Sequence, residues 1–170
     1  QFETIHPFGD GNGRIGRLLL SITVQEWCGL SGPWLYMSAY FERNKSAYMD
    51  LLLSVSTKGT WTEWIEFCLE GAVFQANDAE KRCDQLLKLH KDYHRRIKAG
   101  SIRLAKIVDA LFEVPVVSVK HLRDILGVTH PTVRADLRKL ESMKIVEEIE
   151  NFGQLTYYCP DIYGVTYEAI

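Results

Sequence analysis

Apolar residues recur every three or four positions through the first part of the chain, which is the spacing of one buried helix face. The pattern predicts a helix over residues 14–27, directly after a glycine-rich turn, and another over residues 37–54 with an interruption near Asn44. A third, much longer helix is predicted over residues 60–98. This part of the chain is therefore predicted to be entirely helical.

The pattern changes in the C-terminal part. Short amphipathic stretches over residues 104–111, 119–126 and 132–143 predict three further helices. Two runs rich in β-branched and aromatic residues, 145–149 and 155–159, predict a β-hairpin after them. Three helices followed by a hairpin is the layout of a winged helix-turn-helix.

We therefore predict a mainly α fold in two parts. Residues 1–98 form a helical domain that ends in the long bridging helix, and residues 99–170 form a winged-helix domain of α+β type. Hydrophobic residues make up 46% of the 170 and charged residues 25%, which excludes a disordered or fibrous protein. The net charge of −2 excludes a strong overall affinity for nucleic acid, so any charged partner must bind a local site.

Neither a membrane span nor a disulfide framework is indicated. No apolar run reaches the length of a membrane span, and the four cysteines are too scattered to suggest a zinc finger or paired bridges. The pattern favours a cytoplasmic protein with reduced cysteines. The first residue is Gln1 and no signal peptide follows it, so we expect the chain to begin inside a longer protein.

The glycine-rich turn before the first helix has the composition of an anion site. Gly11, Asn12 and Gly13 can orient successive backbone N–H groups toward a phosphate, and the N-terminus of a helix adds partial positive charge. Arg14 and Arg17 are three residues apart, so both guanidinium groups are expected on one face of that helix. The segment is predicted to bind phosphate oxygens.

Two neighbouring side chains suggest phosphate-transfer chemistry. The carboxylate of Asp10 is a ligand suited to Mg²⁺, and the imidazole of His6 titrates near neutral pH and can accept a proton. The G-x-G-x-x-G spacing of residues 11–16 does not indicate a dinucleotide site, because no strand precedes it and Tyr36 stands where an acid is expected. A phosphate-binding loop of the Gly-Lys-Ser/Thr type is also excluded.

The residues from His6 to Arg17 read H-P-F-G-D-G-N-G-R-I-G-R. This run resembles the complete signature of Fic-domain proteins, H-x-F-x-[D/E]-G-N-G-R-x-x-R, and matches it at every fixed position. The rest of the chain is similar to the C-terminal part of the larger bacterial Fic proteins that carry a winged helix. The resemblance implies the C-terminal part of a Fic helical domain, a fragment that can be inactive without the segments expected before Gln1.

The resemblance further implies a protein adenylyltransferase that moves AMP from ATP to a Ser, Thr or Tyr hydroxyl of a protein and releases pyrophosphate. The acceptor can be another protein or the enzyme itself. His6 would be the general base, Asp10 the Mg²⁺ ligand, and Phe8 a core residue that fixes the loop. The nucleotide phosphates would be bound by Gly11, Asn12, Gly13, Arg14 and Arg17, with Arg17 at the γ-phosphate or at an inhibitory glutamate. Removal of AMP, or transfer of another phosphate-linked group, remains the alternative within this family.

The winged helix allows a second function. Residues 119–144 hold six basic and three acidic residues, and Thr132, Arg134 and Arg138 are candidate DNA contacts on the second helix of the motif. The predicted wing, however, carries three glutamates, which phosphates would repel; they are Glu147, Glu148 and Glu150. This balance favours a protein contact, with a homodimer as one form of it, over a DNA-binding regulator.

One further pair stands out in the long helix. His90 and His94 are one helical turn apart and lie among basic residues. Two histidines do not complete a metal site without a third ligand, so a solvated basic face is the preferred interpretation.

Overall fold

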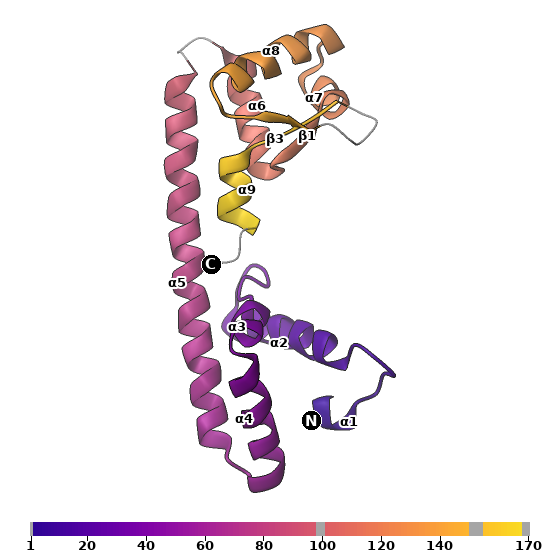
Figure 1. Ribbon diagram of the computed structural model, residues 1–170, viewed down its shortest axis with the longest axis vertical. Coiled ribbons are helices and arrows are strands. Elements are labelled where there is room, and N and C mark those ends of the chain that lie inside the picture. The colour runs from indigo at the N-terminus through magenta and orange to yellow at the C-terminus, as the bar shows by residue number, and fades with distance from the viewer. Residues whose placement is uncertain (1, 98–100, 150–154, 168–170) are drawn as a thin grey trace. The chain divides into compact units, whose positions relative to one another are not determined.

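The computed structural model describes residues 2–97, 101–149 and 155–167 of the chain. These residues fold into two compact units, Gln1–Glu80 and Lys81–Ile170 (Figure 1). Helices dominate both units, and a small antiparallel sheet occurs in the second. The predicted class, mainly α with a winged helix, is confirmed. No described helix combines the length and the apolar character that crossing a membrane requires.

The described residues of the first unit form helices and no strands. Its elements are α1 (Phe2–Ile5), α2 (Asn12–Cys28), α3 (Met37–Arg43), α4 (Lys45–Lys58) and the first part of α5 (Trp61–Arg96). Glycines end α2 and α4 as the turn signals predicted: Gly29 has a φ of 62° and Gly59 a φ of 71°, a conformation that glycine adopts without strain. Asn44 separates α3 from α4, and its side-chain amide donates to the Tyr40 carbonyl at 2.9 Å.

The core of the first unit forms where α3 and α4 pack on α5. Three side chains are buried there: Met37, Phe41 and Phe67. The Phe41 ring packs against the rings of Phe67, Tyr48 and Trp64. This core is small, because many apolar side chains of the unit are exposed.

Helices α3 and α5 approach each other closely at one glycine. A Cβ on Gly71 would lie 2.5 Å from the Tyr40 ring and 2.8 Å from the end of Met37. Only glycine fits at this position, and the contact fixes the spacing of the two helices.

The second unit has the elements of a winged helix. After the end of α5 they are α6 (Ile102–Glu113), β1 (Val116–Ser118), α7 (Val119–Leu126), α8 (His130–Ser142), β2 (Glu147–Ile149), β3 (Thr156–Tyr158) and α9 (Pro160–Tyr167). The three predicted helices and both predicted strands are present. The wing turn predicted at residues 151–154 lies outside the described residues, as does Glu150.

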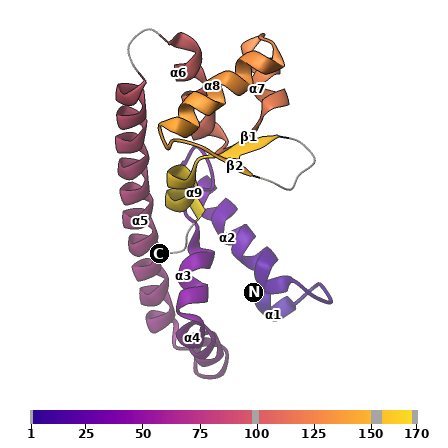
Figure 2. The same cartoon turned by 45° about the horizontal axis from the view of Figure 1, so that its top comes forward.

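The sheet has three strands, one more than the predicted hairpin (Figure 2). Strand β3 is central and pairs antiparallel with both neighbours, so that Tyr157 lies opposite Val117 on β1 and opposite Glu148 on β2. Strand β1 has only three residues and runs directly into α7, and the sequence pattern did not predict it. The order β1-β3-β2 closes the sheet over α6, α7 and α8.

The last turns of α5 belong to the core of the second unit. Tyr93 is completely buried and Ile97 nearly so, and both pack with the apolar residues of α6 to α9. This packing places the division between the compact units inside α5, whereas the sequence prediction divided the chain between residues 98 and 99, after the helix.

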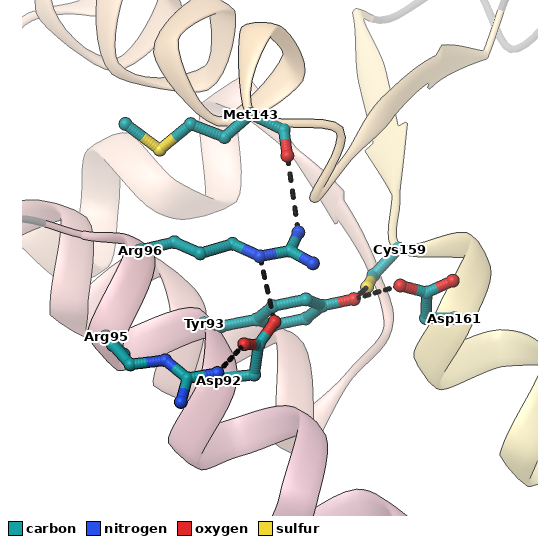
Figure 3. A network of polar contacts seen from close by, with 7 residues as sticks. All are labelled: Asp92, Tyr93, Arg95, Arg96, Met143, Cys159 and Asp161. Atoms are coloured by element: carbon teal, nitrogen blue, oxygen red, sulfur yellow. Dashed lines mark hydrogen bonds and ion pairs between the residues drawn. The ribbon is translucent and has the colours of Figure 1, made fainter.

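A polar network holds α5 to the start of α9 (Figure 3). The Tyr93 hydroxyl donates to Asp161 Oδ2 at 2.8 Å and lies 3.4 Å from the Cys159 sulfur. Burial, together with these two partners, raises the pKa of Tyr93 far above its usual value. The hydroxyl therefore stays protonated and serves as a structural donor.

An ion pair joins α6 to α8, the second helix of the helix-turn-helix motif. The Asp136 carboxylate is 1% exposed, and the Arg103 guanidinium donates to both of its oxygens, with the Nη2 contact at 3.2 Å. Lys139 lies 3.7 Å from the same carboxylate. A buried carboxylate without partners would destabilise the unit, so these contacts fix α8 on α6.

Candidate functional site

The loop between α1 and α2 carries the residues that the sequence singled out. His6 ends α1 with a φ of 49°, a conformation uncommon for residues other than glycine, although histidine tolerates it better than most. Gly11 immediately precedes α2 with a φ of 83°. A Cβ there would both strain the backbone and approach the Arg14 guanidinium to 3.3 Å. The two left-handed residues turn the chain from one helix into the next.

Asn12 fixes the shape of this loop. Its side-chain oxygen accepts from the Phe8 N–H at 3.0 Å, and its side-chain amide donates to the Phe8 carbonyl at 2.6 Å. The residue is 2% exposed, so the two bonds are shielded from water. An asparagine is required because both a donor and an acceptor are used. Its role in the structure is thus to hold the loop, in addition to the phosphate contact predicted for it.

The first turn of α2 leaves backbone donors available. No side chain caps this helix, and its first described internal bond runs from the Ile15 N–H to the Gly11 carbonyl. The N–H groups of Asn12, Gly13 and Arg14 precede that bond and point out of the helix end. With the helix dipole, these N–H groups form a site suited to an anion.

Asp10 and Arg14 form an ion pair across the loop. Arg14 Nη2 lies 3.1 Å from Asp10 Oδ2, and both side chains are mostly exposed, at 73% and 92%. Such a pair contributes little stability because water solvates both charges. Both groups are therefore free to exchange partners, Arg14 for a phosphate and Asp10 for a cation.

Arg17 occupies a different environment from Arg14. It lines a cavity of about 170 Å³ together with Glu3, Tyr48 and Trp64, and its Nη1 lies where a Cβ on Gly13 would approach it to 3.3 Å. Burial raises the pKa of Tyr48 and the Glu3 carboxylate raises it further, while a hydrogen bond from Arg17 opposes both. Glu3 and Tyr48 were not found from the sequence, because nothing in their spacing relates them to Arg17.

His6 is exposed, and its imidazole has no hydrogen-bond partner among the described side chains. The ring is therefore accessible from solvent.

Phe8 differs from the expectation. Phe8 is 47% exposed, and among the described aromatic rings its ring neighbours only that of Phe2, with ring centroids 6.3 Å apart. It therefore does not pack into the core as predicted. The reason is that Phe8 precedes α2 on a turn held away from the core by Asn12, which leaves the ring on the outer side of the loop.

The second candidate surface is α8 of the helix-turn-helix. Arg134 and Arg138 are exposed on it and Thr132 is half-buried, with its hydroxyl 2.9 Å from that of Thr129. Within the described residues neither arginine has a carboxylate at ion-pair distance. In contrast, Lys139 on the same helix faces Asp136.

The wing presents negative charge beside this helix. The Tyr157 hydroxyl donates to Glu148 at 2.9 Å and the Tyr158 hydroxyl to Glu147 at 3.0 Å, so both carboxylates are held on strand β2. The basic residues of α8 and the acidic residues of β2 thus both occur in the structure as the sequence indicated, with a basic helix next to an acidic strand.

Two families match parts of this chain. Residues 1–23 match the model of the Fic/DOC family, and this segment includes the whole loop from His6 to Arg17. Residues 103–151 match the DeoR-like helix-turn-helix domain, which covers α6, α7, α8 and β2.

Proposed function

We propose that this chain, a Fic/DOC segment followed by a DeoR-like helix-turn-helix domain, acts as a protein adenylyltransferase. The Fic/DOC match supports a Fic-type function in general. The observation that carries the more specific proposal is the anion site at the start of α2, with its uncapped N–H groups next to an exchangeable Asp10–Arg14 pair. A nucleoside triphosphate bound with a divalent cation matches both parts of that site, the N–H groups and the Asp10–Arg14 pair.

The residues present fit Mg²⁺ bound together with ATP. Asp10 offers an exposed carboxylate oxygen, and a hard cation prefers such ligands. When bound, Mg²⁺ would neutralise phosphate charge. Arg14 would then leave Asp10 for the β- and γ-phosphate oxygens. The N–H groups of Gly11, Asn12 and Gly13 would donate hydrogen bonds to phosphate oxygens and so form an anion cradle. Arg17, placed beside Glu3, would contact the γ-phosphate.

In the proposed reaction a protein hydroxyl attacks the α-phosphorus of ATP. His6 removes the hydroxyl proton, a new P–O bond forms to the protein, and the bond to the β-phosphate oxygen breaks, so that pyrophosphate leaves with its electron pair. The helix N-terminus stabilises the charge that develops on the phosphate oxygens. A Ser, Thr or Tyr hydroxyl is the acceptor in this proposal, and a second copy of the chain, as in a homodimer, is one source of it.

Mass spectrometry tests this function directly. Incubation of the full-length protein with ATP and Mg²⁺ should add the mass of one AMP to the protein or to a target protein. His6→Ala should abolish the gain while retaining ATP binding, because the imidazole acts on the hydroxyl rather than on the nucleotide. His121→Ala, which removes an exposed histidine of α7, is the matched control and should behave as the wild type. Equal AMP transfer by the His6 variant would contradict the proposal, and loss of AMP from a modified protein would favour the reverse reaction.

A second function, DNA binding by α8, is favoured by the DeoR-like match. If Arg134 and Arg138 contact phosphates, replacing each by alanine should weaken binding to duplex DNA and lower the slope of its salt dependence by about one unit. Lys139→Ala is the control on the same helix, since its ammonium already faces Asp136. Absence of retention on duplex DNA at low salt would leave protein contact as the role of this domain.

A further inference from the structure

Three potential metal ligands meet between α5 and α6 in the second unit. His90 and His94 lie one turn apart on α5, with ring centroids 4.3 Å apart. Asp109 of α6 completes the group: its Oδ1 lies 3.0 Å from His90 Nε2 and 2.8 Å from His94 Nε2. The third ligand that the two histidines lack in the sequence is therefore supplied by a helix that follows them.

The core of the unit holds these three side chains in place. On α6, the neighbours Val108 and Leu111 are completely buried, which fixes the rotation of the helix and directs Asp109 toward α5. On α5, Tyr93 lies between the two histidines in sequence and is itself anchored in the core. The His90 ring also meets the edge of Phe112 at 5.0 Å. The ligand atoms are thus positioned by packing as well as by their own hydrogen bonds.

The local charges suit a cation. The Asp109 carboxylate is the acidic member of the group, and its Oδ1 faces the Nε2 atoms of both His90 and His94. Arg95 and Arg96, the next residues along α5, both form ion pairs with Asp92, which reduces their repulsion of a cation (Figure 3).

We propose that His90, His94 and Asp109 form a binding site for a divalent transition metal of the Zn²⁺ class. Imidazole nitrogen and carboxylate oxygen are ligands of such ions, and two histidines four residues apart on a helix present both rings to one ion. At Zn–ligand distances of about 2.0–2.2 Å, tetrahedral geometry separates neighbouring ligand atoms by roughly 3.3 Å. The two nitrogen–oxygen distances, 2.8 and 3.0 Å, would each have to increase by only a few tenths of an ångström, and all three ligand atoms lie within 4.8 Å of one another.

The metal would replace the two protons that now bridge the histidines to Asp109. Each Nε2–H···Oδ1 contact is a hydrogen bond to the carboxylate, and metal binding breaks both. A neutral ring then carries its single proton on Nδ1, whereas a doubly protonated ring keeps the Nδ1 proton and loses the Nε2 proton to water, so that each Nε2 lone pair faces the metal. The side chains are 33 to 53% exposed, so a water molecule can complete the coordination. The ion would link α5 to α6 and stabilise the second unit.

Zinc binding by the full chain is the test. The protein is treated with a chelator, exchanged into buffer and titrated with Zn²⁺ against a chromophoric chelator, while its thermal midpoint is followed. One equivalent should bind and raise the midpoint. Asp109→Asn keeps an oxygen that accepts both hydrogen bonds but removes the charge, and should fold normally. Asp109→Asn and His94→Ala should each lower the affinity for Zn²⁺ by at least about 100-fold. Removing a residue that only hydrogen-bonds to a metal ligand costs up to about that much, and these two variants remove a ligand itself.

Matched controls separate this site from others on the chain. His121→Ala should bind as the wild type, and so should a protein whose exposed Cys28 and Cys83 are alkylated. No uptake by the wild type at roughly 100 μM free Zn²⁺, which would saturate a site of micromolar affinity, would overturn the proposal. Unchanged binding by Asp109→Asn and His94→Ala would overturn it as well, because the ion would then lie elsewhere.

Discussion

Asn12 uses both ends of one amide group to hold the loop of the candidate site. The Phe8 N–H and carbonyl are both bound by this side chain within a nearly buried pocket. Asn12→Ala would remove both bonds and release the loop that carries His6 and Asp10.

We expect Asn12→Ala to lower the free energy of unfolding by about 1–2 kcal/mol, the contribution of two hydrogen bonds, and to weaken ATP binding. Asn12→Asp retains the acceptor for the Phe8 N–H but places a nearly buried carboxylate oxygen against the Phe8 carbonyl oxygen, so its stability should fall at least as far as that of Asn12→Ala. Urea unfolding and calorimetric titration with ATP measure the two effects. A variant as stable as the wild type, with unchanged ATP affinity, would show that the amide does not hold the loop.

The thiol of Cys68 on α5 is an unusually weak acid. Burial raises its pKa to about 11, whereas Cys28 and Cys83 are exposed. At pH 8 only roughly one thiolate in a thousand forms at this pKa, so iodoacetamide should modify Cys28 and Cys83 long before Cys68. Peptide mass spectrometry over a time course measures the order, and equal rates for all three would contradict it.

The raised pKa also predicts a pH dependence of stability. The folded state holds the Cys68 proton more tightly than the unfolded state, in which a thiol has a pKa of about 8.5. The resulting stabilisation is present below that value and is lost as the pH rises toward 11. In Cys68→Ser, the free energy of unfolding measured as a function of pH should therefore fall less steeply in the alkaline range.

Tyr93 shows how one side chain attaches an element. Its hydroxyl bonds to Asp161 at the first turn of α9 and contacts Cys159 just before it. We expect Tyr93→Phe to lower the stability of the second unit by about 1 kcal/mol, the net value of one such bond. Tyr163→Phe, at a residue 44% exposed, is the control and should have no effect. Chemical denaturation compares the two; equal stability of both variants would contradict the role of the hydroxyl.

Elements differ in how clearly the sequence encodes them. The long helix α5 and the helices α6 to α8 follow from apolar periodicity, because each buries one face. Helix α9 does not: its sequence contains Gly164 and β-branched residues that disfavour helices. Tertiary contacts stabilise it instead, through the buried Ile162 and through Arg82, whose guanidinium donates to the Val165 carbonyl.

The same distinction applies to the candidate sites. His6 to Arg17 are contiguous, so their spacing alone identifies the loop and its anion cradle. Glu3, Tyr48 and Asp109 take part through folding, on elements that are distant in sequence or unrelated by periodicity. No pattern within one helix could have paired Asp109 with His90 and His94.

The two units differ greatly in their cores. Among the described residues, seventeen buried side chains form the core of the second unit, while three form that of the first. Several large apolar side chains of the first unit are also exposed, including Leu18 and Ile22 of α2. Buried apolar surface is the main source of stability, so the second unit should be the more stable.

Amide hydrogen exchange should therefore be faster in α2 to α4 than in α6 to α8. Exchange followed by mass spectrometry of peptides measures this difference. Slower exchange in α2 to α4 would show that the first unit is stabilised by more than its described core. The proposed zinc site should slow exchange in α6 further when Zn²⁺ is added.

The position of strand β2 at the edge of the sheet has a consequence for self-association. Its outer backbone groups could accept a strand from a second molecule, but a two-fold antiparallel pairing would bring Glu147 and Glu148 of each copy against those of the other. At neutral pH this repulsion opposes sheet extension between chains. A homodimer of this protein would then have to form through another surface. The acidic side chains of β2 also oppose aggregation through the outer backbone groups of that strand.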